Sequence, residues 1–249
     1  MRERVLVEAC VESVESAVAA AEGGADRVEL CDALVEGGTT PSAGSIRLAR
    51  ERLDIGICVM IRPRGGDFLY TDLEFEIMRR DVVTARDLGA DGVVLGLLRP
   101  DGTVDRERTA RLVDDAGPVP VTFHRAFDVS RDPMEALETL IDLGVRRVLT
   151  SGQTATALES LPLIAKLVRT AGSRITILAG GGITPANAAR VVAETGVGEI
   201  HLYAPRRFPS PMEFRNESVP MGMPYRPDEY VRTVTDASAI RAVVESIRG

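Results

Sequence analysis

The chain has 249 residues, of which 45% are hydrophobic and 27% charged, and its formal net charge is −7. This length suits one α/β barrel with a large core, and the acidic balance argues against a nucleic-acid partner. No apolar run reaches the ~18 residues of a membrane span, and no signal-peptide pattern opens the sequence. We therefore expect a cytoplasmic protein without a membrane partner, whose three cysteines are free thiols.

Short β-branched runs alternate with amphipathic helical stretches along the sequence. In chain order, each strand followed by its helix, the predicted elements are Val5–Cys10, Ser13–Glu22, Arg27–Cys31, Ser42–Arg52, Gly56–Arg62, Asp72–Leu88, Gly92–Leu98, Asp105–Ala116, Val119–His124, Pro133–Leu143, Arg147–Ser151, Ala155–Thr170, Arg174–Gly180, Pro185–Glu194, Glu199–Tyr203 and Ala237–Ile247. Such alternation is typical of βαβ units and a parallel sheet. Eight units predict a single (β/α)8 TIM barrel over residues 1–249.

A repeated glycine turn supports this prediction. Gly24, Gly89, Gly144 and Gly196 each end a predicted helix and precede strands two, four, six and eight. A left-handed glycine at such a position caps the helix and turns the chain into the next strand. An open doubly wound sheet has similar turns and is the alternative, but eight evenly spaced units overfill it.

One segment interrupts the rhythm. Residues 204–235, between the last predicted strand and the last helix, are rich in Pro, Met and Arg. We predict a long loop there, and loops of this length in compact domains are usually functional or form subunit contacts.

Two Glu-x-Cys sequences end the first two predicted strands. Glu8 and Cys10 share one face of the first strand, and Glu29 and Cys31 share one face of the second, because side chains alternate along a strand. Neighbouring strands lie ~4.8 Å apart. We therefore expect two carboxylates and two thiols to converge at one edge of the barrel mouth.

The third strand ends in a polar, glycine-containing loop. Arg62 shares a face with Cys58 and is predicted to point inward beside Glu29, whereas Cys58 reads as a small core residue. Arg64 and Asp67 follow in the loop, where a Gly-Gly pair allows close approach of the backbone to a ligand.

Polar residues also end strands five, seven and eight. His124 is followed by Arg125 and Asp128, and His201 lies on the last strand. Gly181 and Gly182 follow strand seven, where this fold commonly holds a phosphate through backbone N–H groups. Polar residues on so many strand ends predict a functional site.

Structural explanations remain open for each of these groups. Glu8, Glu29 and Arg62 could form a buried ion-pair layer that fills the barrel. The two thiols could be apolar packing, and both histidines could be structural. The sequence does exclude some chemistry: the lone Lys166 lies in a helix pattern, which rules out a Schiff-base aldolase. No nucleotide or PLP cofactor is expected.

The sequence resembles the copper homeostasis protein CutC family over nearly its whole length. The matching phrases are Glu8-x-Cys10, Gly24–Cys31, Glu36–Ser42, Ile61–Phe68, Val121–Asp128, Arg147–Gly152 and Phe214–Asn216. The resemblance implies a barrel, a cytoplasmic location, a homo-oligomer (dimer or tetramer) and a role in copper handling. One departure is Tyr203, which stands where the family often has a small serine and could narrow the mouth.

Carried over from that family, the proposed Cu(I) ligands fall on Cys10 and Cys31. Cu(I) is soft and accepts two thiolates. Met221 and Met223 are possible accessory thioethers, although loop packing explains them as well.

A metal-independent enzyme is the alternative hypothesis. Its substrate would be a small phosphorylated or carboxylated metabolite. Its reaction would be a proton transfer of the isomerase or lyase type. Glu8 or Glu29, with a pKa raised by burial and mutual repulsion, would be the base. The remaining acid–base groups would be His124 and Asp67. The ligand would be bound by Arg62, Arg64, Arg125, Asp128, Gly181, Gly182 and His201.

Overall fold

Eight parallel strands close into a barrel in the computed structural model, which describes residues 4–216, 218–219 and 230–248. The strands pair in chain order, and the last pairs with the first. They are β1 (Leu6–Val11), β2 (Arg27–Leu30), β3 (Gly56–Met60), β4 (Gly92–Leu95), β5 (Val121–Phe123), β6 (Arg147–Thr150), β7 (Thr176–Ala179) and β8 (Glu199–Leu202). The predicted TIM barrel is confirmed.

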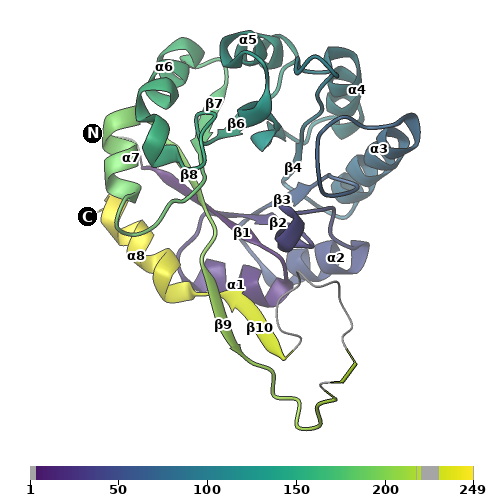
Figure 1. Ribbon diagram of the computed structural model, residues 1–249, viewed down its shortest axis with the longest axis vertical. Helices are drawn as coiled ribbons and strands as arrows, with labels where there is room; N and C mark the ends of the chain where they lie inside the picture. Colours follow the sequence, from purple (N-terminus) through teal and green to yellow (C-terminus); the bar gives the residue numbers. More distant parts are fainter. Residues whose placement is uncertain (1–3, 217, 220–229, 249) are drawn as a thin grey trace.

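A ring of helices surrounds the strands (Figure 1). They are α1 (Val14–Glu22), α2 (Ala43–Arg52), α3 (Asp72–Asp87), α4 (Arg106–Ala116), α5 (Pro133–Asp142), α6 (Leu161–Ala171), α7 (Ala188–Thr195) and α8 (Ala237–Arg248). Local signals fix several of their starts: Ser13 accepts the Ser16 N–H, and Thr71 and Glu74 form a reciprocal capping box.

The repeated glycine turns have the expected conformation. Gly24, Gly89, Gly144 and Gly196 have φ of +92°, +91°, +73° and +75°. A side chain at such a residue costs about 1–2 kcal/mol, so glycine is favoured where the helix stops and the next strand begins.

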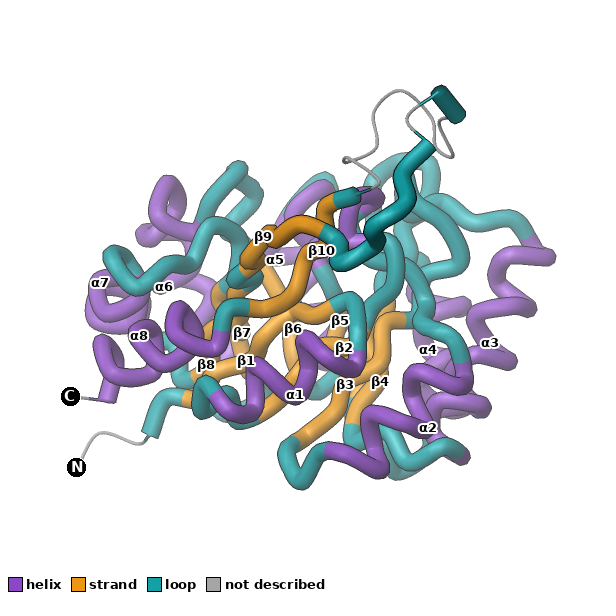
Figure 2. Tube along the Cα trace, turned by 90° about the horizontal axis from the view of Figure 1, so that it is seen from below, coloured by secondary structure: helices purple, strands orange, loops and turns teal. Residues whose placement is uncertain are grey.

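The segment after β8 differs from the predicted loop at both of its ends. Strands β9 (Pro205–Pro209) and β10 (Val231–Thr235) pair as an antiparallel ribbon. The ribbon projects beyond the ring of helices beside α1 (Figures 1 and 2). Thr235 N–H donates to Ser16 Oγ at 3.1 Å, which ties the ribbon to that helix. The β-branched run Val231–Thr235 explains the strand. Met221 and Met223 lie outside the described residues.

The strand register gives the barrel an unusually polar interior. Apolar residues such as Val7 and Ala9 pack outward under the helices and are fully buried. The alternate residues point inward. Glu8 is level with Arg27 on β2 and with His201 on β8, and Cys10 is level with Glu29. Sequence alternation therefore stacks charged and sulfur-containing side chains in the lumen.

Candidate functional site

A closed ion-pair network forms the floor of the lumen, at the amino ends of the strands. Arg27 Nε donates to Glu8, and Arg27 Nη2 donates to Glu199 at 2.6 Å. Arg147 Nε lies 2.9 Å from the same Glu199 carboxylate. The other oxygen of Glu8, Oε1, lies 2.8 Å from His201 Nδ1. These carboxylates are therefore matched by cations in the barrel interior.

Glu8 is consequently not the raised-pKa base that the sequence suggested. Burial opposes its ionisation, but Arg27 and His201 outweigh burial and lower its pKa to about 2. The expected rise took account of burial and of repulsion with Glu29 and left out the neighbouring cation Arg27. Arg27 shares the inward face of β2 with Glu29 and could have been found by the same alternation.

Above the floor, both thiols converge on one carboxylate. The Sγ atoms of Cys10 and Cys31 lie 3.3 and 3.5 Å from Glu29 Oε2. All three side chains are buried. Their ligand atoms lie within 4.8 Å of one another, as do those of a second group formed by Glu8, Glu29 and His201. The predicted convergence is confirmed for Cys10, Cys31 and Glu29, whereas Glu8 belongs to the floor network and reaches this cluster only through Glu29 and His201.

The two thiols have opposite protonation tendencies. A hydrogen bond from Cys31, assisted by His201, outweighs burial and lowers the pKa of Cys10 to about 5. The same hydrogen bond, together with burial, raises the pKa of Cys31. The surroundings therefore favour the thiolate form at Cys10, and thiolates are the metal-binding form of cysteine.

Glu29 and His201 titrate in the direction that keeps this cluster close to neutral. Burial and the Cys10 sulfur raise the pKa of Glu29. Burial alone would lower the pKa of His201, but Glu29, Cys10 and Glu8 raise it well above its usual value. Oε1 of Glu29 is buried and has no hydrogen-bond partner among the described residues. A bound water or ligand would satisfy this oxygen.

Arg62 is buried at the mouth but does not lie beside Glu29 as predicted. Its Nη1 donates to the carbonyls of Glu36 and Gly38, both at 2.8 Å, and its Nη2 donates to the Gly66 carbonyl at 2.8 Å. Glu29 pairs with Cys58, so Arg62 lies four residues further along β3. Cys58 is buried at 1% exposure, as expected of a core residue.

Arg64 and Asp67 lie outside this cluster. Arg64 Nε donates to Glu74 at 2.6 Å, and its Nη2 donates to Asp67 at 3.1 Å. The Asp67 side chain is 75% exposed. Their contacts hold the β3–α3 loop on α3, and their roles in ligand binding and catalysis stay predictions.

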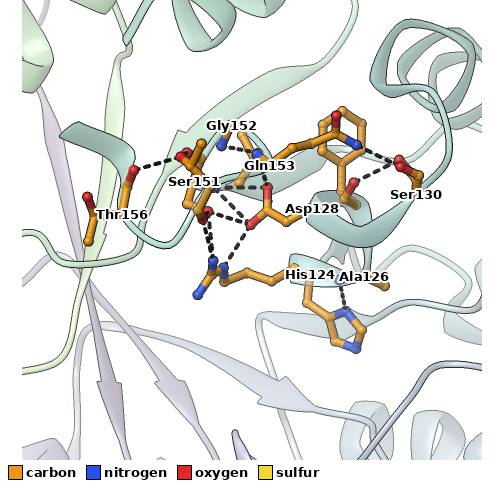
Figure 3. Close-up of polar contacts among 12 residues, drawn as sticks. His124, Ala126, Asp128, Ser130, Ser151, Gly152, Gln153 and Thr156 are labelled. Carbon is orange, nitrogen blue, oxygen red and sulfur yellow. Dashed lines mark hydrogen bonds and ion pairs between the residues drawn. The ribbon is translucent and has the colours of Figure 1, made fainter. Parts of the chain in front are cut away.

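Arg125 and Asp128 belong to a dense loop network (Figure 3). Asp128 accepts hydrogen bonds from Arg125 Nε at 2.7 Å, from the Ser151 N–H at 3.0 Å and from the Gln153 N–H at 3.1 Å. Thr150 Oγ1 donates to it as well, at 2.5 Å. The network ties the β5 loop to the β6 loop. Sequence analysis missed these partners because the two loops are separate in the chain.

The glycines after β7 have a packing role in the structure. Gly181 and Gly182 have φ of +92° and +70°. A Cβ on Gly181 would lie 2.9 Å from Ser151, and one on Gly182 would lie 2.8 Å from Thr156. The predicted phosphate site at these glycines stays a prediction.

Among the described residues, no helix is long and apolar enough to cross a bilayer.

Two residues of the floor network, Arg147 and Glu199, were not singled out from the sequence. Each is the first residue of its strand, and its side chain is on the same inward face as the residue two positions later. The alternation of side chains along the strand could therefore have identified both.

Comparison with known proteins identifies the family. Residues 5–205 match the model of the CutC family. The human copper homeostasis protein cutC homolog is 51% identical over 238 residues, which cover 96% of this chain and 87% of the human one. A CutC family protein of Mesorhizobium japonicum is 51% identical over 243 residues, which cover 98% of this chain and 94% of that one.

Solved structures agree with this relationship. A CutC protein from Streptococcus agalactiae has 39% identity and a TM-score of 0.76, over 79% of this chain and 97% of that one. Phosphoribosylanthranilate isomerase from Thermotoga maritima, at 13% identity and a TM-score of 0.57, shares the fold alone. Long, specific matches over nearly the whole sequence leave one conclusion: the chain belongs to the CutC family of copper homeostasis proteins.

Proposed function

We propose that this protein binds Cu(I) through Cys10 and Cys31. The observation that carries the proposal is the convergence of both sulfur atoms on Glu29 Oε2, at 3.3 and 3.5 Å. Cu(I) is soft and prefers thiolate ligands. The names of the relatives, which refer to copper homeostasis, support the same reading.

The surrounding groups suit a monovalent cation. Cys10 already favours the thiolate, with a pKa lowered to about 5 by Cys31 and His201. A bound cation would stabilise the second thiolate by the same electrostatic argument. Glu29 Oε2 lies within reach of both sulfurs as a further ligand atom. A cytoplasmic location and a homo-oligomeric state stay predictions.

A Cu(I) competition titration under anaerobic conditions tests the proposal. The double variant Cys10→Ser/Cys31→Ser is expected to lose at least about 100-fold in affinity, because hydroxyls are poor ligands for a soft ion. Cys58→Ala is the matched control: Cys58 is the only other cysteine, and it packs beside the site on β3 but belongs to neither candidate metal group. Unchanged binding in the double variant contradicts the proposal.

The alternative of a metal-independent isomerase or lyase stays a prediction. Glu8 is ion-paired and is no longer a candidate base for such an enzyme. Glu29, with its raised pKa, and His124 remain available for proton transfer.

A further inference from the structure

Arg62 is a buried cation without a counter-ion. The residue is 5% exposed, and it makes no ion pair with any residue that the structure describes. Its Nη atoms donate only to backbone carbonyls, and its Nε–H makes no well-formed hydrogen bond, with the buried, neutral Tyr70 hydroxyl as the neighbouring side-chain group. A buried charge that is not neutralised is costly, and carbonyl dipoles offset only part of that cost. The position therefore favours an anion.

His124 presents a second unused donor. The Ala126 N–H donates to His124 Nδ1 at 3.1 Å, so Nδ1 carries no proton. The neutral ring must then carry its proton on Nε2. Burial and the charge of Arg62 lower the pKa of His124 to about 3, which keeps the ring neutral at pH 7. Nε2 is buried without a partner, and the ring points away from the Asp128 network (Figure 3).

These two side chains lie on the same aromatic ring and close enough for the Arg62 charge to act on His124. The His124 ring centroid lies 4.9 Å from that of Phe68, and the Arg62 guanidinium carbon lies 5.2 Å from the same ring. Gly96, the residue after β4, lies against the imidazole: an added Cβ would lie 2.5 Å from the His124 ring. The missing side chain leaves room for the imidazole at the end of β4.

The layer below supplies one hydroxyl and an apolar floor. Met60 is paired with Val94, and Val94 is paired with Thr122, so the three lie level across β3, β4 and β5. Thr122 Oγ1 is buried and lacks a partner among the described residues. Met60 and Val94 are buried and apolar. One positive charge, two N–H donors, one hydroxyl and apolar walls match a small planar monoanion.

We propose that Arg62, His124 and Thr122 bind the carboxylate of a small organic monoanion, whose organic part packs against Phe68 and Met60. A phosphate dianion suits the site less well, because it needs more donors than these three side chains offer. The site is separate from the proposed copper site and goes further than the enzyme alternative by naming the group that is bound.

The two sites share one wall. The Gly38 carbonyl accepts from Arg62, and a Cβ on Gly38 would lie 3.2 Å from Cys31 Sγ. Gly38 has φ of +89°, which favours glycine. The two sites are therefore adjacent yet use different side chains, so they can be tested separately.

Histidine-selective ¹⁵N NMR tests the proposal directly, because the chain has only two histidines. Acetate, pyruvate and benzoate are each titrated into the metal-free protein, with acetamide, benzamide and inorganic phosphate as controls. At least one carboxylate is expected to shift the His124 Nε2–H signal saturably, whereas the amides and phosphate leave it unchanged. No saturable shift of His124 with any carboxylate overturns the proposal, as does an ordered water there that none of them displaces.

Matched variants identify the residues involved. Arg62→Gln is expected to weaken carboxylate binding at least about tenfold, whereas Arg79→Gln, on α3 and with the same change of charge, leaves it unaltered. His124→Asn retains an acceptor for the Ala126 N–H, removes the Nε2 donor and is expected to weaken binding equally. Equal affinities in Arg62→Gln and Arg79→Gln overturn the assignment.

The Cys10→Ser/Cys31→Ser variant separates this proposal from copper binding. Carboxylate binding is expected to persist in it, and His124→Asn is expected to retain Cu(I). If either variant binds neither the carboxylate nor Cu(I), the two ligands share one site, which contradicts the proposal of two.

Discussion

The floor and the mouth of the barrel use the same kinds of side chain and differ in how completely those side chains are paired. At the floor, Arg27 joins Glu8 to Glu199 in a closed network. At the mouth, Arg62 has no carboxylate partner among the described residues, and His124 Nε2 is left without an acceptor. An unmatched buried polar atom costs about 1–3 kcal/mol. Completeness of pairing, more than polarity, therefore separates the stabilising end of this barrel from the end at which we propose ligand binding.

The largest expected effect on stability comes from removing the cation Arg27 from the floor network. Arg27→Met leaves two buried carboxylates without their shared cation and is expected to lower the free energy of unfolding by about 3–5 kcal/mol. Urea unfolding measures the loss. Arg232→Ala, which breaks the exposed ion pair with Glu15, is the control and should cost under about 1 kcal/mol. Similar losses in both variants would remove the distinction between floor and surface.

The two histidines are expected to give effects of intermediate size. Their contributions to the free energy of unfolding depend on pH in opposite directions. The pKa of His124 is lowered to about 3, so its contribution to stability is complete above pH 6.5 and is lost as the pH falls toward 3. The pKa of His201 is raised, so its contribution is complete below pH 6.5 and is lost as the pH rises through the folded-state value.

Urea unfolding of wild type, His124→Asn and His201→Asn between pH 5 and 8 measures both contributions. Relative to His124→Asn, the wild type should lose on the order of 2 kcal/mol between pH 6.5 and 5. Relative to His201→Asn, it should lose stability as the pH rises above 6.5. If the two differences in free energy of unfolding changed with pH in the same direction, the assignment of a lowered pKa to His124 and a raised pKa to His201 would be contradicted.

The smallest effect is expected at the rim. Tyr203 is 45% exposed, so Tyr203→Ser should change the free energy of unfolding by no more than about 0.5 kcal/mol. The smaller side chain should nevertheless widen the strand-eight side of the mouth and speed alkylation of Cys10 several-fold, as measured by mass spectrometry. Val129→Ser, at another exposed apolar residue, is the control. An unchanged rate at Cys10 would show that Tyr203 does not restrict access.

The barrel was predictable because its signals are local. Helix caps, alternating strand residues and the left-handed glycines after helices each act within a few residues. The β9–β10 ribbon was not predicted, because Pro205 and Pro209 weaken the strand pattern and pairing between distant segments decides the outcome.

The candidate site was predictable in composition and less so in its pairing. Alternation correctly brought Cys10, Cys31 and Glu29 together. It did not show that Arg27 neutralises Glu8, nor that Arg62 turns to loop carbonyls, since both depend on the stagger between strands and on side-chain length. Which polar atom remains without a partner is a property of the whole three-dimensional arrangement.

Gly38 has a consequence for how such a protein can change over generations. Its carbonyl holds Arg62, its α-carbon lies against Cys31, and its backbone conformation favours glycine. A mutation at this one position alters the wall of both sites at once. If both proposed ligands bind, selection for either one therefore constrains the other.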